Sequence, residues 1–358
     1  MISPSGDRIC VVIVAYNAEA FILDCLASVL KSEDADVRVV VVDNGSTDRT
    51  RAVIRDWAAN AEDYQVPGDC PVPIAPFSTP PEFEVLSPGQ VPAETALKQL
   101  TLVESDENGG FAAGVNIGLR VGGVDPSVDH FWVLNPDSVV TAKTAAAFLS
   151  VAKEEPGYGL ITGRACYYDT PETVQIDGGL INHWTGVTSN ANVGKPAKSV
   201  AMPKGGDLDF AFGGNMMASR SFFETCGEMP EDYFLYYEEV DWSLRRREFP
   251  MLTSKEALIF HRAGASIGSP IFGGRNASPF SLYFKHRARM MFVRRYLPAS
   301  WFVAAAYTLA KAAQIGVKGD AAGMSAVLKG GFGLGPPKSV AEKLKTSSLS
   351  RIGAMERA

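Results

Sequence analysis

Two adjacent glutamates in the segment YYEEVD are candidates for acid–base chemistry. Glu238 and Glu239 stand where a helical pattern begins, and a helix N-terminus favours the ionised form of a carboxyl group. A carboxylate in this state can remove a proton from an attacking hydroxyl group. Asp241 follows in the first turn of the same helix, where we expect it to orient the site or Arg245 rather than to react. The alternative is that these acidic residues only start a helix.

A second group of polar side chains follows strand-like sequence. Asn135 and Asp137, in NPDS, come directly after HFWVL, two residues apart and able to point the same way. Oxygen ligands of this kind suit Mg²⁺ or Mn²⁺, which hold a diphosphate through a few protein oxygens together with phosphate and water. His261 follows ALIF and could bind the metal or the diphosphate, although a lone histidine is more often structural. By itself, NPD is also a common turn.

A third polar segment, VDNGSTD at Val42–Asp48, ends an apolar run. Ligands of open α/β sheets bind at the carboxyl edge of the strands, so we expect a nucleotide there. Asp43 could accept a hydrogen bond from the base or the ribose, and Tyr16, in VAYN, could stack on the base. Alone, this segment could equally be a turn and a helix cap.

Alternating apolar patterns predict the elements that carry these groups. Continuous β-branched runs are typical of parallel strands buried on both faces, and apolar residues at helical spacing separate them. The predicted strands are Ile9–Val14, Val37–Val42, Leu100–Val103, His130–Leu134, Leu208–Phe212 and Leu258–His261. The predicted helices are Ala18–Lys31, Asp48–Ala59, Ala112–Arg120, Ala142–Lys153, Arg220–Thr225 and Glu238–Glu248. This alternation predicts an α/β fold with a mostly parallel sheet flanked by helices, followed by a helical C-terminal extension.

A proline-rich stretch interrupts this pattern. Eight prolines between Tyr64 and Pro92 exclude a regular helix or an interior strand. We therefore expect an inserted surface loop over about residues 60–98, and we assign it no chemistry. The resulting domain prediction is a catalytic domain over 1–265 and a basic helical region over 266–358.

Charge is distributed unevenly along the 358 residues. Residues 1–280 hold 21 basic and 37 acidic residues, and residues 281–358 hold 13 basic and 3 acidic ones. The acidic body argues against a nucleic acid partner, while the basic, apolar-rich tail fits an anionic membrane surface. Basic residues are interleaved with Met, Phe and Val in Phe284–Tyr296, and Trp301–Ala310 is apolar and aromatic; this composition suits a pair of helices lying in a membrane interface. A solvated helix face or a homodimer interface would use similar residues.

The remaining composition narrows the expected location. No apolar run in the tail approaches the roughly 18 residues that a membrane span needs. The N-terminus has no basic start or small-residue cleavage site typical of a secretory signal. The five cysteines are scattered without a CxxC pair, which suits neither a disulfide framework nor a zinc site. We expect a cytoplasmic protein, peripheral on the inner face of a bacterial inner membrane.

Six motifs occur together and in order: VAYN, VVDNGSTD, ENGGFAAGVNIGL, NPDS, FGGNMMASR and DYFLYYEEVDWSLR. The set resembles glycosyltransferase family 2, and more narrowly the bacterial rhamnosyltransferase-like branch of that family. HRAGAS, which begins at His261, is similar to a segment that follows the catalytic region in this branch. The resemblance covers about residues 8–265. It implies a GT-A fold, an inverting mechanism, a divalent metal (Mg²⁺ or Mn²⁺), a nucleoside diphosphate sugar as donor and a lipid-linked or glycan acceptor in cell-surface polysaccharide biosynthesis.

The resemblance also implies roles for individual residues. Asp137, Asn135 and His261 would hold the metal, although Asn135 replaces the usual first aspartate and removes one formal charge. Glu239 stands where the family has its base, with Glu238 before it and Asp241 after it. The donor site would comprise Ala15, Tyr16, Asn17, Asp43, Asn44, Asn108, Gly110, Gly114, Asn116, Asn135, Gly214 and Asn215.

Several alternatives stay open. The donor expected from the resemblance is dTDP-L-rhamnose, and UDP-hexose or UDP-galactofuranose are the alternatives. A non-catalytic nucleotide-binding module would keep DNGSTD but would have no need for NPDS and YYEEVD. A nucleotidyltransferase usually begins with a glycine-rich, basic phosphate loop, and this sequence has none.

Overall fold

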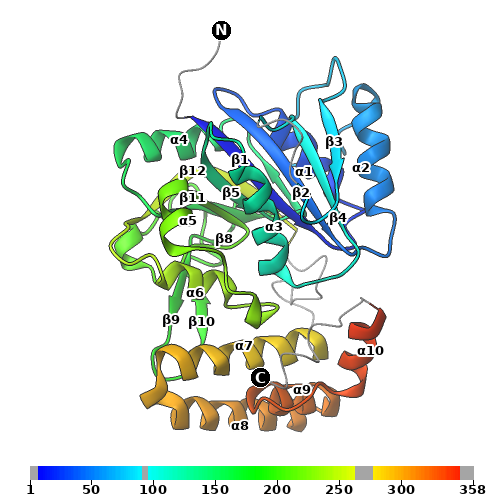
Figure 1. The fold of residues 1–358 in the computed structure, drawn as a ribbon. Coiled ribbons are helices and arrows are strands. Elements are labelled where there is room, and N and C mark those ends of the chain that lie inside the picture. Colours follow the sequence, from blue (N-terminus) through cyan, green and yellow to red (C-terminus); the bar gives the residue numbers. More distant parts are fainter. Residues whose placement is uncertain (1–6, 91–95, 263–276, 347–358) are drawn as a thin grey trace.

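The computed structural model describes residues 7–90, 96–262 and 277–346. Within these ranges the chain forms a central sheet of ten strands, flanked by helices and followed by a layer of C-terminal helices (Figure 1). The main path through the sheet runs β3-β4-β2-β1-β5-β11-β7-β12-β6, and β8 pairs with β7. β3, β4, β2, β1 and β5 are mutually parallel, as are β7 and β12, while β11 runs antiparallel to both of its neighbours. The predicted mostly parallel α/β fold is confirmed.

The strands of the sheet are β1 (Arg8–Ala15), β2 (Asp36–Asn44), β3 (Phe83–Leu86), β4 (Leu100–Ser105), β5 (Val128–Leu134), β6 (Ser138–Val140), β7 (Leu160–Tyr167), β8 (Val174–Ile176), β11 (Asn215–Ser219) and β12 (Met251–His261). A separate hairpin joins β9 (Gly179–Ile181) to β10 (Thr188–Asn190). The helices of this part are α1 (Ile22–Leu30), α2 (Thr50–Ala59), α3 (Phe111–Gly123), α4 (Thr144–Glu154), α5 (Arg220–Cys226) and α6 (Glu238–Leu244).

Alternate residues of β1 face two different cores. Ile9, Val11 and Ile13 pack with α1, α2 and α4 on one face of the sheet. Cys10 and Val12 pack with α3, α5 and α6 on the other. A strand covered by helices on both faces needs apolar residues at every position, which explains the unbroken run ICVVIV.

Helix α3 lies unusually close to β1. A Cβ added at Gly114 would lie 2.5 Å from a methyl group of Val14. A Cβ added at Gly118 would lie 2.3 Å from a methyl group of Val12. Glycine therefore lets the helix approach the sheet closely. This contact fixes the start of α3, and with it the loop before it, at the carboxyl edge of the sheet.

The structure departs from the predicted elements at several places. The proline-rich insert contributes β3, which pairs only with β4 at the sheet's edge, so its prolines exclude an interior strand but not this short edge strand. The predicted strand over 208–212 is wrong, because Phe210 makes only an isolated bridge to Gly179. Helix α6 ends at Leu244, earlier than Glu248, whereas β12 begins at Met251, earlier than Leu258.

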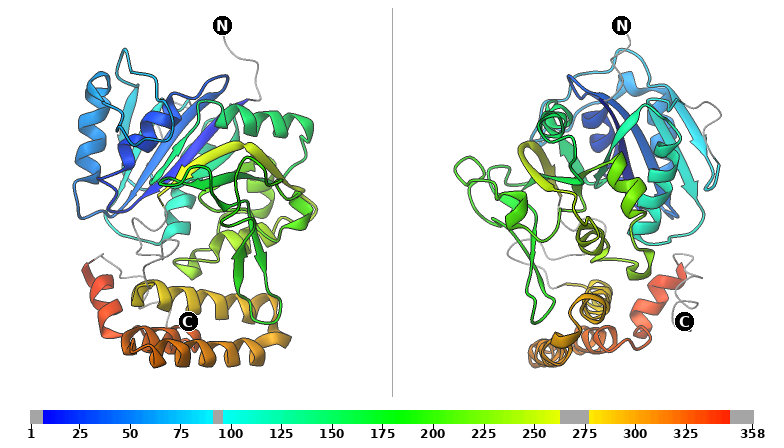
Figure 2. Two further views of the ribbon diagram at one scale, coloured as in Figure 1. Left: turned by 180° about the vertical axis from the view of Figure 1, so that it is seen from behind. Right: turned by 60° about the vertical axis from the view of Figure 1, so that its left-hand side comes forward.

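The C-terminal helices form a layer beneath the carboxyl edge of the sheet (Figure 2). They are α7 (Pro279–Tyr296), α8 (Trp301–Val317), α9 (Ala321–Gly331) and α10 (Lys338–Thr346). Their own core contains Tyr283, Phe284, Ala326 and Val340. The predicted domain boundary at 265 and 266, and the end of the HRAGAS segment, lie outside the described residues.

Helix α7 is a buried helix, which corrects the expectation that it lies on a membrane. Ten of its 18 residues are buried, on more than one side. Three of its arginines donate hydrogen bonds to groups of the protein: Arg287 to Asp232, Arg289 to Thr185 and Arg295 to Asp241. These positive charges are therefore used for internal packing. Among the described residues, no helix is both long and apolar enough to span a bilayer.

Candidate active site

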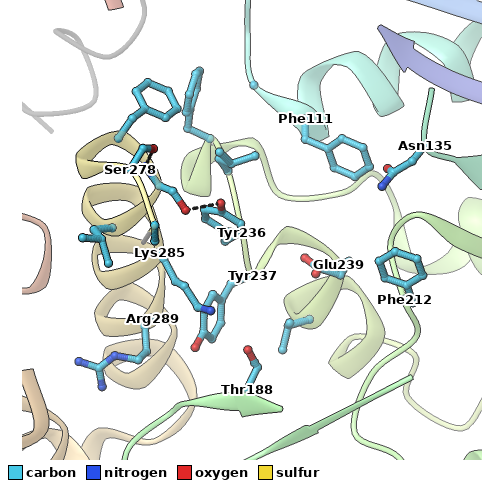
Figure 3. Close-up of a pocket in the computed structure, with 18 of the residues that line it drawn as sticks. Phe111, Asn135, Thr188, Phe212, Tyr236, Tyr237, Glu239, Ser278, Lys285 and Arg289 are labelled. Atoms are coloured by element: carbon cyan, nitrogen blue, oxygen red, sulfur yellow. Dashed lines mark hydrogen bonds between the residues drawn. The ribbon is translucent and has the colours of Figure 1, made fainter. Parts of the chain in front are cut away.

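A cavity of about 1060 Å³ lies between the carboxyl edge of the sheet and the C-terminal helices. Ligand pockets commonly measure about 300–1,000 Å³, so this cavity lies at the upper end of that range. Elements far apart in the sequence contribute to its wall, as the close-up in Figure 3 shows. The predicted site residues that line it are Tyr16, Asn17, Asn44, Asn108, Gly110, Asn135, Asp137, Glu239 and His261.

Side-chain hydrogen bonds shape the wall at the ends of β1 and β2. Asn17 has a positive φ of 50° and its Oδ1 accepts a hydrogen bond from the Thr47 amide at 2.8 Å. Asn44 Nδ2 donates to the Gly110 carbonyl at 2.9 Å and to Asn108 Oδ1 at 3.1 Å. These asparagines therefore join VAYN, DNGSTD and the loop before α3 into one continuous surface.

Asp43 lies behind this surface. Its side chain is fully buried, and its Oδ1 accepts a hydrogen bond from Arg51 Nε at 2.5 Å. Oδ2 is buried and has no hydrogen-bond partner among the described residues. A buried carboxylate oxygen without a donor is costly. Asp43 does not line the cavity, so Oδ2 would meet a ligand only if the residues in front of it moved.

Asn135, Asp137 and His261 come together at the ends of β5 and β12. His261 Nε2 lies 3.0 Å from Asn135 Nδ2 and 3.0 Å from Asp137 Oδ1. On the other side of the ring, Nδ1 lies 2.8 Å from Gln175 Oε1. The three residues predicted to hold a metal are thus neighbours, and Gln175 orients the histidine.

The hydrogen bonds around His261 leave Nε2 without a proton. With Gln175 Oε1 as acceptor, Nδ1 carries the proton, and Nε2 accepts from Asn135 Nδ2 at 3.0 Å. Nε2 and Asp137 Oδ1 are 3.0 Å apart, so both atoms could contact one cation if Asn135 turned away. An imidazole nitrogen and a carboxylate oxygen fit Mn²⁺ or Mg²⁺, and a hydrogen bond to the remote ring nitrogen is a usual support for a ligating histidine.

The protein supplies only part of a coordination shell. No group of three or more His, Cys, Asp or Glu side chains in the described part of the chain could hold a metal ion alone. Asn135 contributes an amide where a carboxylate would add charge. A divalent ion at this site therefore depends on oxygens of a bound diphosphate to complete its shell.

Glu239 and Glu238 face different surroundings at the start of α6. Glu239 lines the cavity and is partly accessible, whereas Glu238 is buried, with 3% of its surface exposed. Glu238 Oε2 has no hydrogen-bond partner among the described residues. Burial raises the pKa of Glu238 well above its usual range, with the neighbouring Glu239 adding to the shift, and burial also raises the pKa of Glu239. Of the two, only Glu239 can reach a substrate.

Burial and the helix N-terminus act in opposite directions on the pKa of Glu239. Removal from water raises it, and this outweighs hydrogen bonds to backbone N–H groups, which lower it. The expectation that Glu239 is ionised at neutral pH stays a prediction. A carboxylate with a raised pKa is a stronger base than an exposed one. It still ionises once the pH exceeds that raised value.

The backbone before α6 is strained. Phe234, Tyr236 and Tyr237 have φ angles of 69°, 70° and 70°, in the left-handed region that bulky residues avoid. Conformations of this kind cost about 1–3 kcal/mol each and persist only where surrounding contacts hold them. The Phe234 carbonyl accepts from the Phe111 amide at 3.0 Å, and the Tyr237 hydroxyl donates to the Gly186 carbonyl at 2.6 Å. This segment aims Glu239 into the cavity.

Asp241 joins α6 to α7. Its fully buried carboxylate accepts hydrogen bonds from Arg245 Nε at 2.6 Å, Arg295 Nη1 at 2.7 Å and the Tyr233 hydroxyl at 2.9 Å. The predicted pairing of Asp241 with Arg245 is confirmed. Since Asp241 does not line the cavity, it positions Glu239 rather than contacting a substrate.

Several residues expected in the donor site belong to the scaffold instead. Gly114 packs on β1, and Ala15 is fully buried in the sheet. Asn116 is fully buried, and its amide bonds to the backbone of Met229 and to Glu231. Asn215 is also fully buried and accepts from Trp132 Nε1 at 3.0 Å. Their hydrogen-bonding groups are occupied within the fold, so these side chains support the wall from behind.

Two adjacent glycines leave room for the reacting groups. A Cβ at Gly213 would lie 3.1 Å from the Glu239 side chain, and one at Gly214 would lie 2.6 Å from Asn135 Nδ2. Side chains there would push these residues out of place. Gly214 therefore acts through packing, although it does not line the cavity itself.

Sequence reasoning missed other residues of the wall. Gln175 and Thr188 line the cavity and come from segments without a recognisable motif. Phe212 and Tyr236 also line it; they belong to the motifs FGGNMMASR and DYFLYYEEVDWSLR, but the sequence analysis gave them no role. Lys285 and Arg289 stood out only as part of the basic tail, and the charge pattern did not indicate which side of the helix faces inward.

Comparisons with known proteins agree with this architecture. Residues 10–66, from β1 to just beyond α2, match the family model described as Glycosyl transferase family 2. The low-salt glycan biosynthesis hexosyltransferase Agl10 of Haloferax volcanii is 25% identical over 198 residues, which are 53% of this chain. The chain spans 58% of the length of that relative. The N-terminal segment thus carries the glycosyltransferase family 2 pattern.

Solved structures of glycosyltransferases share the fold. GalNAc-T7, solved with UDP, GalNAc and Mn²⁺, superposes with a TM-score of 0.55 at 11% identity, over 82% of this chain and 48% of that chain. The mannosyltransferase PcManGT from Pyrobaculum calidifontis, solved with GDP-Man and Mn²⁺, gives a TM-score of 0.45 at 16% identity, over 98% and 86% of the two chains. The likeness to GalNAc-T7 concerns the fold alone, and the predicted GT-A fold class is confirmed.

We predict that Asp137→Asn weakens Mn²⁺ binding roughly tenfold or more when UDP is present, because loss of a charged ligand exceeds the typical effect of losing a supporting hydrogen bond. Free Mn²⁺ is measured by electron paramagnetic resonance during titration. The matched control is Asp129→Asn, near the start of β5 and away from the cavity. Equal affinity in the two variants would contradict a role for Asp137 as ligand.

Proposed function

We propose that the protein is an inverting glycosyltransferase that moves a hexose from a nucleoside diphosphate sugar to a hydroxyl group of an acceptor. One observation carries the proposal: the Glu239 carboxylate and the group formed by Asn135, Asp137 and His261 open into the same cavity. A base and a diphosphate-holding site on opposite sides of one space are what direct displacement at an anomeric carbon requires. The similarity to the hexosyltransferase Agl10 supports the substrate class.

The proposed reaction uses Glu239 as general base. The carboxylate takes the proton of an acceptor hydroxyl while that oxygen bonds to the anomeric carbon. The bond from this carbon to the diphosphate oxygen breaks, and the electron pair leaves with the nucleoside diphosphate. Attack opposite the leaving group inverts the anomeric configuration.

Other residues of the cavity would serve binding. Asp137 and His261 would hold Mn²⁺ or Mg²⁺, which when bound neutralises negative charge developing on the diphosphate. Tyr16 lines the cavity beside Asn17 and offers a ring for the nucleoside base. Asp43, behind the cavity wall, would offer its unpartnered Oδ2 as an acceptor of a hydrogen bond only if the residues in front of it moved.

The particular donor rests on motif resemblance. NPDS and YYEEVD are similar to the rhamnosyltransferase-like branch, so dTDP-L-rhamnose is the favoured donor, with UDP-hexose and UDP-galactofuranose as alternatives. A lipid-linked or glycan acceptor follows from the same resemblance. A non-catalytic nucleotide-binding module is the competing function, and it would neither hydrolyse nor transfer the donor sugar.

We predict that Glu239→Gln lowers the rate of sugar transfer by roughly a hundredfold or more, the scale of general-base removal, since glutamine keeps the shape but not the basicity. Nucleotide and Mn²⁺ binding should stay nearly normal. Transfer is followed by release of the nucleoside diphosphate with a panel of donors and acceptors.

Glu238→Gln is the matched control for this substitution. Because Glu238 is buried and does not line the cavity, replacing its carboxyl group by an amide of the same shape should change transfer little. If Glu238→Gln abolishes transfer while Glu239→Gln does not, the base is Glu238.

We also propose that α8 attaches the protein to the cytoplasmic face of an anionic membrane. Phe302, Leu309 and Val317 are 80%, 54% and 90% exposed, and Ala306, Ala310 and Ala313 between them are exposed as well. These residues recur at helical spacing and make one apolar stripe along α8. An apolar stripe on a basic region is the pattern of a helix lying in a membrane interface. Of the two helices expected there from the sequence, the proposal keeps the one that contains Trp301–Ala310.

We predict that changing Phe302, Leu309 and Val317 together to serine weakens binding to vesicles containing anionic phospholipid by tenfold or more, since each buried apolar side chain contributes about 1.5–3 kcal/mol. Binding is measured by co-sedimentation at low and high salt. Val66→Ser, at an exposed valine in the N-terminal half, is the control and should bind like the unchanged protein. If the triple variant keeps its vesicle binding but dissociates a dimer in sedimentation velocity, the stripe is an oligomer interface instead.

A further inference from the structure

A positively charged wall faces the donor side of the cavity. Figure 3 shows Lys285 extending from α7 towards Tyr237, with Glu239 lying between it and Asn135. Among residues 7–90, 96–262 and 277–346, Lys285 has no ion pair or hydrogen bond within its reach. Lys285 is an exposed side chain that lines the cavity, and it is a cation without a counter-charge among the described residues.

Neighbouring cations add to this charge. Lys311 also lines the cavity, and its Nζ donates to the neutral Gln314 side chain at 3.0 Å. Desolvation, together with the nearby Lys311, lowers the pKa of Lys285. Like charges that are partly removed from water repel one another, and an anion between them would relieve that repulsion.

Arg289 strengthens the positive potential from behind. Its side chain is 3% exposed, and its guanidinium donates only to neutral oxygens: the carbonyls of Thr185 and Ala304, and the Thr308 hydroxyl, which lies 2.5 Å from Nη2. Its Nε has no partner among the described residues. A buried arginine is normally paired with a carboxylate. Arg289 has no carboxylate partner among the described residues, so its positive charge acts on its surroundings, including the cavity.

His286 provides an unsatisfied polar atom on the same wall. It is 6% exposed, it lines the cavity, and its Nδ1 has no hydrogen-bond partner in the described part of the chain. Burial and the charges of Arg289, Lys285 and Lys311 lower the pKa of His286 to about 3. The ring is therefore neutral and keeps a nitrogen available for a ligand.

We propose that Lys285, together with Lys311 and His286, binds a phosphate or diphosphate group carried by the acceptor. The inference rests on the proposed function and names the chemistry of the second substrate. The donor diphosphate has its own site at Asp137 and His261, on the far side of Glu239, so this second anionic group belongs to the acceptor. With the phosphate at Lys285, the acceptor's hydroxyl would extend towards Glu239.

The source of the phosphate is either a lipid diphosphate or a soluble sugar phosphate. Phe280, Leu282 and Leu235 line the same end of the cavity and would accompany an apolar chain. Both ligands share the anionic group that Lys285 recognises. Their affinities can therefore be compared in one assay.

The test is calorimetric titration of the full-length protein with inorganic pyrophosphate in metal-free buffer, which disfavours the donor site. Lys285→Met should weaken binding by about tenfold or more, the loss of one charge-assisted hydrogen bond, and Lys285→Arg should retain most of it. The matched control is Lys318→Met, an exposed lysine at the end of α8, which should bind as the unchanged protein does. Parallel titrations with farnesyl diphosphate and glucose 1-phosphate distinguish a lipid from a soluble source.

A second measurement separates this inference from the proposed function. Lys285→Met should raise the acceptor KM in transfer assays by a larger factor than it raises the donor KM. If Lys285→Met binds pyrophosphate as tightly as the unchanged protein, or if neither protein binds it, the phosphate site is wrong although donor hydrolysis persists. If the unchanged protein neither hydrolyses nor transfers any donor sugar, the proposed function itself fails.

Discussion

The buried carboxylate of Asp241 is the interaction on which the cavity depends. It holds two arginines and a tyrosine, and one of those arginines, Arg295, belongs to α7. Asp241 is fully buried while both arginines are 37% exposed, so solvent screens each ion pair in part; losing Arg295 would still leave the buried carboxylate with fewer donors. Through this contact, the helix that carries Glu239 is fixed relative to the helix that carries Lys285. The cavity between a sheet edge and a helical layer therefore has a defined width.

The carboxyl edge of the sheet was predictable from sequence because strand patterns and polar endings are local signals. Asn135, Asp137 and His261 each follow an apolar run, and the sheet brings the ends of these runs together. The parallel register of β1 and β2 likewise places VAYN beside DNGSTD. Long, unbroken β-branched runs left few alternatives for these strands, so the fold class followed from them.

Other parts depend on contacts that no local pattern reveals. Asn116 belongs to a donor-site motif, yet its amide holds the loop at Met229, because α3 turns that face away from the cavity. The left-handed backbone of Tyr236 and Tyr237 comes from tertiary contacts and leaves no mark in residue type. In the basic tail, Arg295 and Lys285 look alike in sequence, but one is bound to Asp241 and the other faces the cavity. Charge counts showed that the C-terminal tail has a positive net charge, but they did not show which of its side chains face the cavity.

The central claim is that one cavity holds the diphosphate at Asp137 and His261 and offers Glu239 to the acceptor from the opposite side. A crystal structure of the protein with Mn²⁺ and a nucleoside diphosphate, with the ion located by its anomalous scattering, tests this most directly. The account predicts Mn²⁺ bound to the Asp137 carboxylate and His261 Nε2, with the terminal phosphate facing the side of the cavity where Glu239 lies. A nucleotide bound outside this cavity, or an ion that does not contact Asp137, would contradict it.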